Sequence, residues 1–131
     1  MDAAKRTLKD CGIKSDTIMF EYDVHDMQRA VAWYKDILGF DIIFESGDCH
    51  TEFSLPVKGA RLALSRVEPD VKIEKAARLF IPTSDIYAVE AYLQGKGVQT
   101  EPVENVDDVV LILWVEDCEG NHFAFEQWLA R

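Results

Sequence analysis

The chain has 131 residues, 48% of them apolar, which is enough to bury a hydrophobic core without disulfide or metal support. Its formal net charge of −10 disfavours nucleic acid and anionic membrane surfaces as partners, because both attract lysine and arginine. No apolar run approaches the roughly 20 residues of a membrane span, and the charged beginning is unlike a secretory signal, so we expect a soluble, cytoplasmic protein.

The N-terminal segment 1–16 is predicted to form a helical appendage. Ala4, Leu8 and Cys11 recur at helical spacing, and Gly12 supplies a stop. The apolar stripe is thin, and we expect it to pack on the main body.

The segment 17–66 is predicted to form a strand, a helix and three further strands. Residues 17–24 alternate between apolar and polar side chains, which is typical of a half-buried strand. Asp26 then caps a helix whose apolar stripe covers 27–38. The three strands that follow are predicted at 40–46, 50–56 and 60–66.

A polar connector, 67–76, leads to a second module over 77–131 with the same predicted order. Ser84 or Asp85 caps its helix, and a D-C-E-G turn separates its last two strands. The strands of this module are predicted at 77–83, 98–102, 108–116 and 121–128.

The two modules are predicted to be copies of one unit. At an offset of 59 residues, Asp26 aligns with Asp85 and Met19 aligns with Arg78. Neither copy is large enough to bury its own helix and sheet face well, so we expect both to form one domain.

The three cysteines, Cys11, Cys49 and Cys118, are scattered and form no CxxC pair. Their number and spacing predict neither a zinc ribbon nor a disulfide framework, and a reducing compartment is the simplest interpretation. We expect none of them to act as a nucleophile.

Two motifs resemble those of the vicinal oxygen chelate superfamily of glyoxalases, bleomycin-resistance proteins and extradiol dioxygenases. The stretch V-H-D-M-Q-R-A-V-A-W-Y-K-D-I-L-G-F at 24–40 is similar to the opening motif of a module, and W-V-E-D-C-E-G-N-H-F-A-F-E at 114–126 to the closing one. The resemblance covers 17–128. It implies an α+β fold in which two tandem βαβββ modules form curved mixed sheets around a cup.

The resemblance also implies where a divalent metal would be held, on the first and last strands of each module. Those positions correspond here to Met19, Ala63, Arg78 and Ala124. A thioether is a soft ligand, alanine has no donor atom, and a guanidinium repels a cation. We therefore predict that the usual metal site is lost and that the protein needs no cofactor.

In place of a metal, the cup is predicted to offer an acidic ligand-binding surface with one cation and some apolar area. His50 and Glu52 are further candidates. The predicted ligand-binding residues are Met19, Glu21, Asp23, Arg78, Phe80, Trp114, His122 and Glu126.

Several of these residues have purely structural alternatives. Glu21 and Asp23 are equally consistent with a solvated sheet rim. Arg78 is consistent with an ion pair to Glu126 or Glu21. Trp114 and Trp128 are consistent with core or dimer-interface positions. No catalytic residue is assigned.

The leading hypothesis is a metal-independent binding protein that sequesters a small cationic or amphipathic molecule. The alternative is a metal-dependent, glyoxalase-like lyase or dioxygenase that uses displaced ligands such as Glu21, His122 and Glu126. The resemblance further implies a homodimer.

Overall fold

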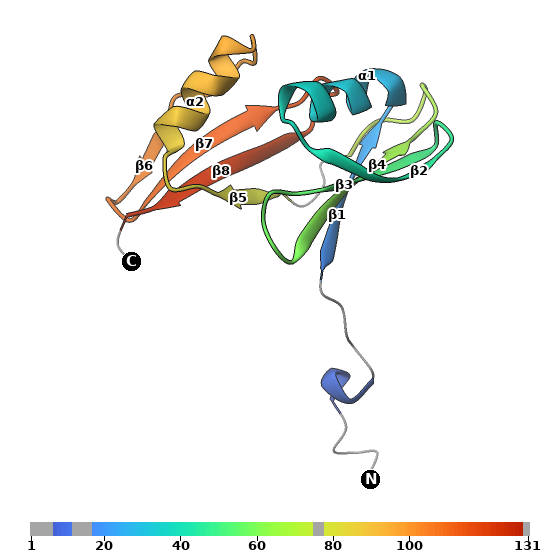
Figure 1. The fold of residues 1–131 in the computed structure, drawn as a ribbon, viewed down its shortest axis with the longest axis horizontal. Coiled ribbons are helices and arrows are strands. Elements are labelled where there is room, and N and C mark those ends of the chain that lie inside the picture. The colour runs from blue at the N-terminus through green and yellow to red at the C-terminus, as the bar shows by residue number, and fades with distance from the viewer. Residues whose placement is uncertain (1–6, 12–16, 75–77, 130–131) are drawn as a thin grey trace.

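The computed structural model describes residues 7–11, 17–74 and 78–129, and it contains two four-stranded sheets that lie side by side, each covered on one face by a helix (Figure 1). The strand order is β1-β4-β3-β2 in the first sheet and β5-β8-β7-β6 in the second. In each sheet the first strand pairs in parallel with the last, and the other pairs are antiparallel. The identical order confirms the predicted α+β fold of two tandem modules.

The first module consists of β1 (Ile18–Val24), α1 (Met27–Ala32), a π-helical turn (Trp33–Ile37), β2 (Asp41–Ser46), β3 (His50–Ser54) and β4 (Ala60–Arg66). The second consists of β5 (Phe80–Pro82), α2 (Ile86–Gly95), β6 (Glu104–Val106), β7 (Val110–Glu116) and β8 (His122–Trp128). Among the described residues, no helix is both long and apolar enough to cross a membrane.

Both helices begin at the expected aspartate caps. The Asp26 carboxylate accepts a hydrogen bond from the Arg29 backbone N–H at 3.0 Å, and Asp85 accepts one from the Ala88 N–H at 3.1 Å. Asp85, not Ser84, is therefore the cap of the second helix. These bonds satisfy backbone donors that have no partner inside the helix.

Strand alternation decides which side chains face the helix and which face away. On β1, Tyr22 and Val24 are buried beneath α1, whereas Met19 and Glu21 are exposed on the opposite side. On β8, Phe123 is buried on the helix side and His122 is exposed on the other, although Ala124 on the His122 side is also buried. We call the side of each sheet opposite its helix the open face.

The predicted strand at 98–102 is wrong. Thr100 forms only an isolated bridge to Val115, and β6 is displaced toward the C-terminus. Pro102 lacks a backbone N–H, so the segment around it cannot continue a ladder of hydrogen bonds.

The predicted start of the next strand, at residue 108, is also wrong, because a tight hairpin occupies that position. The Val109 N–H donates to the Val106 carbonyl at 2.9 Å, and the two central residues, Asp107 and Asp108, have φ of 54° and 57°. This geometry matches a type I′ turn, whose usual sequence signal is Asn-Gly or Asp-Gly. The Asn105 side chain bonds to Asp108 and stabilises the turn.

An Asp107→Gly variant is expected to raise the free energy of unfolding by about 0.5 to 1 kcal/mol, because glycine adopts a positive φ without a steric cost. Chemical denaturation would measure the change. The control is Asp70→Gly, at a turn residue without positive φ, which should be neutral or destabilising. Equal destabilisation in both variants would contradict the expectation.

Within the N-terminal segment, residues 8–11 form a short 3-10 turn, Leu8–Cys11, that lies apart from both sheets (Figure 1). The expectation that the N-terminal segment packs on the main body stays a prediction, because most of its apolar stripe lies outside the described residues. The rest of the predicted appendage, 1–6 and 12–16, lies outside the described residues.

A shared hydrophobic core joins the two modules. The Tyr34 ring lies 5.9 Å from the ring of Phe53 in the first module and 6.4 Å from that of Phe123 in the second. Trp33 also contacts Phe123, at 6.3 Å between ring centroids. Because each half supplies part of this core, neither sheet is packed independently of the other.

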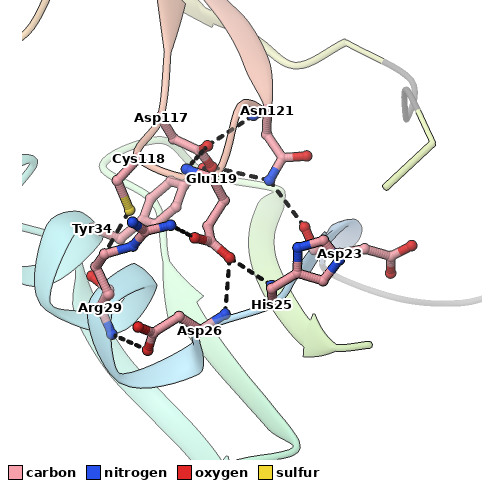
Figure 2. Close-up of polar contacts among 9 residues, drawn as sticks. All are labelled: Asp23, His25, Asp26, Arg29, Tyr34, Asp117, Cys118, Glu119 and Asn121. Atoms are coloured by element: carbon pink, nitrogen blue, oxygen red, sulfur yellow. Dashed lines mark hydrogen bonds and ion pairs between the residues drawn. The ribbon is translucent and has the colours of Figure 1, made fainter. Parts of the chain in front are cut away.

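Hydrogen bonds also connect the two modules (Figure 2). We call this contact the module joint, and it consists of the turn 117–121 and the residues of the first module that the turn contacts. At its centre, the buried Asp117 carboxylate accepts four hydrogen bonds. The donors are the Tyr34 hydroxyl at 2.6 Å, the Glu119 and Asn121 N–H groups at 2.8 Å, and the Asn121 amide at 3.1 Å. The same amide reaches the Asp23 carbonyl on β1 at 3.1 Å.

The second part of the joint is Glu119, whose side chain is only 2% exposed. Its carboxylate accepts hydrogen bonds from the backbone N–H groups of His25 and Asp26 and from the Arg29 guanidinium (Figure 2). A turn of the second module therefore supplies an anion to the start of α1, where backbone donors are otherwise unpaired.

Candidate functional site

A groove of about 840 Å³ opens at one end of the second sheet. The volume lies in the range of small-molecule sites in proteins. Its walls come from β7, from the first residue of β8, from the end of α2 and the segment after it, and from the residue two positions before β5. Six of the residues that line it are Arg78, Gln99, Thr100, Trp114, Glu116 and His122.

The Trp114 ring and the Arg78 guanidinium form one side of this groove, and the Phe80 ring packs against Trp114. The Trp114 and Phe80 rings meet edge to face with centroids 5.3 Å apart, and the Arg78 guanidinium lies 5.0 Å from the centre of the indole. The next residue, Leu79, is buried. Its N–H donates a hydrogen bond to the Tyr22 hydroxyl, and its carbonyl accepts one from the Ala124 N–H on β8. The backbone beside Arg78 is therefore anchored while its side chain remains exposed.

The rim of the groove carries charges of both signs. Glu116 and His122 are 3.7 Å apart, but both side chains are more than half exposed, so their ion pair contributes little stability. No carboxylate of the described residues lies within ion-pair distance of Arg78. The alternative in which Arg78 pairs with Glu126 or Glu21 is therefore wrong, and its guanidinium stacks on Trp114 instead.

The eight predicted ligand-binding residues do not converge on one site. Arg78, Trp114 and His122 line the groove, and Phe80 contacts Trp114 without lining the groove itself. The other four lie outside the groove lining: Met19, Glu21 and Asp23 on the open face of the first sheet, and Glu126 on β8 opposite Pro82.

Sequence reasoning missed several groove residues. Glu116 alternates with Trp114 along β7, so strand periodicity would have found it. Gln99 and Thr100 lie in an irregular segment that carries no such signal. The Thr100 hydroxyl is buried and has no hydrogen-bond partner among the described residues.

A separate polar network lies on the open face of the first sheet. One His50 nitrogen is 3.0 Å from the Ser65 hydroxyl, and the other is 2.9 Å from the Glu52 carboxylate. Arg61 lies 3.0 Å from the other Glu52 oxygen. His50 and Glu52 are thus brought together, but they do not line the groove, and Arg61 compensates the charge of Glu52.

The half-buried thiol of Cys118 is poorly suited to nucleophilic chemistry. Burial, assisted by the Asp117 carboxylate, raises the pKa of Cys118 to about 11. The thiol is therefore protonated at neutral pH, and the thiolate is the reactive form. Cys11 and Cys49 are exposed and form no disulfide.

A family model described as the Glyoxalase/Bleomycin resistance protein/Dioxygenase superfamily matches residues 18–125. The chain belongs to this superfamily. Comparison with curated proteins finds no significant match.

Several solved structures of the superfamily's fold resemble the chain. TnmS3, an antibiotic binding protein from Streptomyces sp. CB03234, is 24% identical, with a TM-score of 0.73 over 88% of this chain and 97% of that one. TioX from Micromonospora sp. ML1 is 18% identical, with a TM-score of 0.70 over 88% and 100%. A lactoylglutathione lyase from Agrobacterium tumefaciens is 12% identical, with a TM-score of 0.68 over 87% and 94%. At these identities the likeness establishes the fold alone.

The closing motif of the superfamily has a structural role in this chain. Asp117 and Asn121, which belong to the motif, form the centre of the module joint and do not face the open sheets. Gly120 has a φ of 86° in the same turn, a conformation that favours glycine. The motif is therefore informative about how the modules dock and carries no information about the ligand.

The four positions predicted to correspond to the superfamily's metal ligands carry side chains that do not fit a divalent cation. β1 pairs with β4 in the same register as β5 with β8, so Met19 is equivalent to Arg78, and Ala63 to Ala124. None of these side chains is a hard donor, and one is a cation. Over 7–11, 17–74 and 78–129, no group of three or more histidine, cysteine, aspartate or glutamate side chains is placed to hold a metal.

Proposed function

We propose that this protein binds a small amphipathic molecule in the groove, without a metal and without covalent chemistry. The observation that carries the proposal is the pairing of an apolar wall, Trp114 backed by Phe80, with polar groups within one open groove. Apolar walls with a few well-placed polar groups are typical of small-molecule sites. The description of TnmS3 as an antibiotic binding protein supports a binding role.

Of the two ligand types expected from the sequence, the geometry favours the amphipathic one. The expectation of a cationic ligand depended on Glu21, Asp23 and Glu126, and none of them lines the groove. The net charge of −10 still attracts cations at long range, but it does not place a carboxylate beside the aromatic wall.

Fluorescence titration against a panel of amphipathic compounds would test this proposal, with mass spectrometry of the recovered compound. We expect saturable quenching in the wild type and an affinity at least about tenfold lower in Trp114→Ala, measured there by isothermal titration because the variant lacks the reporting indole, since stacked aromatic contacts carry a large share of such binding. Trp128→Ala is the matched control, since Trp128 does not line the groove. Binding without chemical change supports the proposal, whereas absence of any saturable response contradicts it.

Metal-dependent lyase or dioxygenase activity is the alternative that the same samples would reveal. Its suggested ligands are divided, with Glu21 on the first sheet and His122 and Glu126 on the second. Conversion of a compound only after addition of Ni²⁺, Zn²⁺, Mn²⁺ or Fe²⁺ would replace the binding proposal by the enzyme.

We also propose that the protein is a cytoplasmic homodimer. Large apolar side chains are exposed on the open face of the first sheet: Met19 is 38% exposed and Phe44 52%. A second copy that covers this face would remove them from water. Size-exclusion chromatography with light scattering should give twice the mass of the chain, and a monomer mass would overturn the proposal.

A further inference from the structure

Arg78 is a cation without an ion-pair partner among the described residues of a strongly acidic chain. Acidic residues outnumber basic ones by 24 to 14, yet no described carboxylate lies within ion-pair distance of its guanidinium. The two carboxylates that line the groove, Glu101 and Glu116, therefore leave Arg78 unpaired, and Glu116 lies near His122 instead. A cation in this situation is available to an anionic group of a ligand.

The guanidinium is also held in place. Its contact with the Trp114 ring uses no N–H donor, and none of its five donors bonds to another residue of the part of the chain that the structure describes. The backbone on its C-terminal side is anchored at Leu79. The Leu79 carbonyl accepts a hydrogen bond from the Ala124 N–H at 2.9 Å, and the Leu79 N–H donates one to the Tyr22 hydroxyl at 3.3 Å. Fixing the group before binding reduces the entropy that a ligand must offset.

The surface next to the guanidinium is aromatic. Phe80 is 40% exposed and meets the half-buried Trp114 edge to face. A planar ring packs well on such a surface, and a carboxylate attached to it can accept two parallel hydrogen bonds from a guanidinium. The aromatic surface therefore suits the ring of an aromatic acid, and the neighbouring guanidinium suits its carboxylate.

We infer that the ligand of the groove is a planar aromatic molecule that carries a carboxylate or a comparably acidic oxygen, and that Arg78 recognises the oxygen. The inference rests on the proposed function and narrows it to one ligand class. The formal charge of the whole chain disfavours such an anion at long range, so selectivity depends on the local contact with Arg78.

Three naphthalene probes of the same ring size test the inference: 2-naphthoate, 2-naphthamide and 2-naphthylmethylammonium. Isothermal titration at two salt concentrations would give Kd for each. We expect 2-naphthoate to bind roughly tenfold or more tighter than the ammonium probe, as charge-assisted hydrogen bonds predict. Arg78→Gln should remove that preference with little effect on 2-naphthamide, and Arg78→Lys should restore only part of it.

Arg66→Gln is the matched control, because it removes the same charge from the far end of β4 in the first sheet. It should leave the preference unchanged. Equal or tighter binding of the ammonium probe, or an unchanged preference in Arg78→Gln, would overturn the inference while leaving the proposed function intact. If none of the three probes binds but a compound of the amphipathic panel does, only the inference is overturned. If no compound of the panel binds either, the inference and the proposed function are both overturned.

Discussion

An Asp117→Asn variant is expected to lose roughly 2 to 4 kcal/mol of its free energy of unfolding. One Asp117 oxygen accepts from two backbone N–H groups, and the other accepts from the Tyr34 hydroxyl and the Asn121 amide. An amide at this position keeps only one acceptor oxygen and places N–H groups against donors. Because the site is buried, the donors left unpaired are not rescued by water.

Urea denaturation of Asp117→Asn, Tyr34→Phe and the double variant would measure the effect. In the Asp117→Asn background, Tyr34→Phe should cost about 1 kcal/mol less than in the wild type, since the hydroxyl has already lost its acceptor. Asp36→Asn, at an exposed carboxylate, should change the stability by less than about 0.5 kcal/mol. Equal losses at Asp36 and Asp117 would show that the module joint does not stabilise the fold.

A Glu119→Gln variant is expected to lose roughly 1 to 3 kcal/mol at neutral pH. The carboxylate caps the start of α1 and accepts from Arg29, and a neutral amide weakens all of these contacts. The loss stays below that of a fully buried ion pair because the Arg29 side chain is 58% exposed.

The contribution of Glu119 is also expected to depend on pH. Burial alone raises the pKa of this carboxyl, but the hydrogen bonds from Arg29, Asp26 and His25 outweigh it and lower the pKa below its ordinary value. The unfolded chain therefore takes up the proton first as the pH falls. The stabilisation is fully present above the ordinary glutamate pKa of about 4.3 and is lost as the pH falls through the lower, folded value.

Denaturation of the wild type and Glu119→Gln between pH 7 and pH 3 would follow this dependence. The difference in stability should be constant near neutrality and shrink in acid. Glu45→Gln, at an exposed residue of β2, should show almost no difference at any pH. A Glu119→Gln difference that grows in acid would show that the carboxyl is favoured in its protonated form.

The superfamily fold could be predicted from the sequence because its elements carry local signals. Apolar alternation defined β1, and aspartate caps placed both helices correctly. The errors fell where local signals conflict: Pro102 prevented a strand that composition favoured, and Asp107 and Asp108 adopted a turn usually marked by glycine. Such turn geometry depends on the strands that it joins as much as on its own residues.

The sequence by itself determined which side of each strand a residue faces, since the strand period is two. It therefore placed Met19 and Glu21 on one open face, and Phe80 and Ala124 on the other. Only the tertiary structure decided that these faces do not share one groove, and that Arg78 stacks on Trp114 rather than pairing with a carboxylate. The physical reason is that alternation is a property of single strands, whereas the placement of two sheets depends on contacts between residues distant in sequence, such as Tyr34 with Asp117.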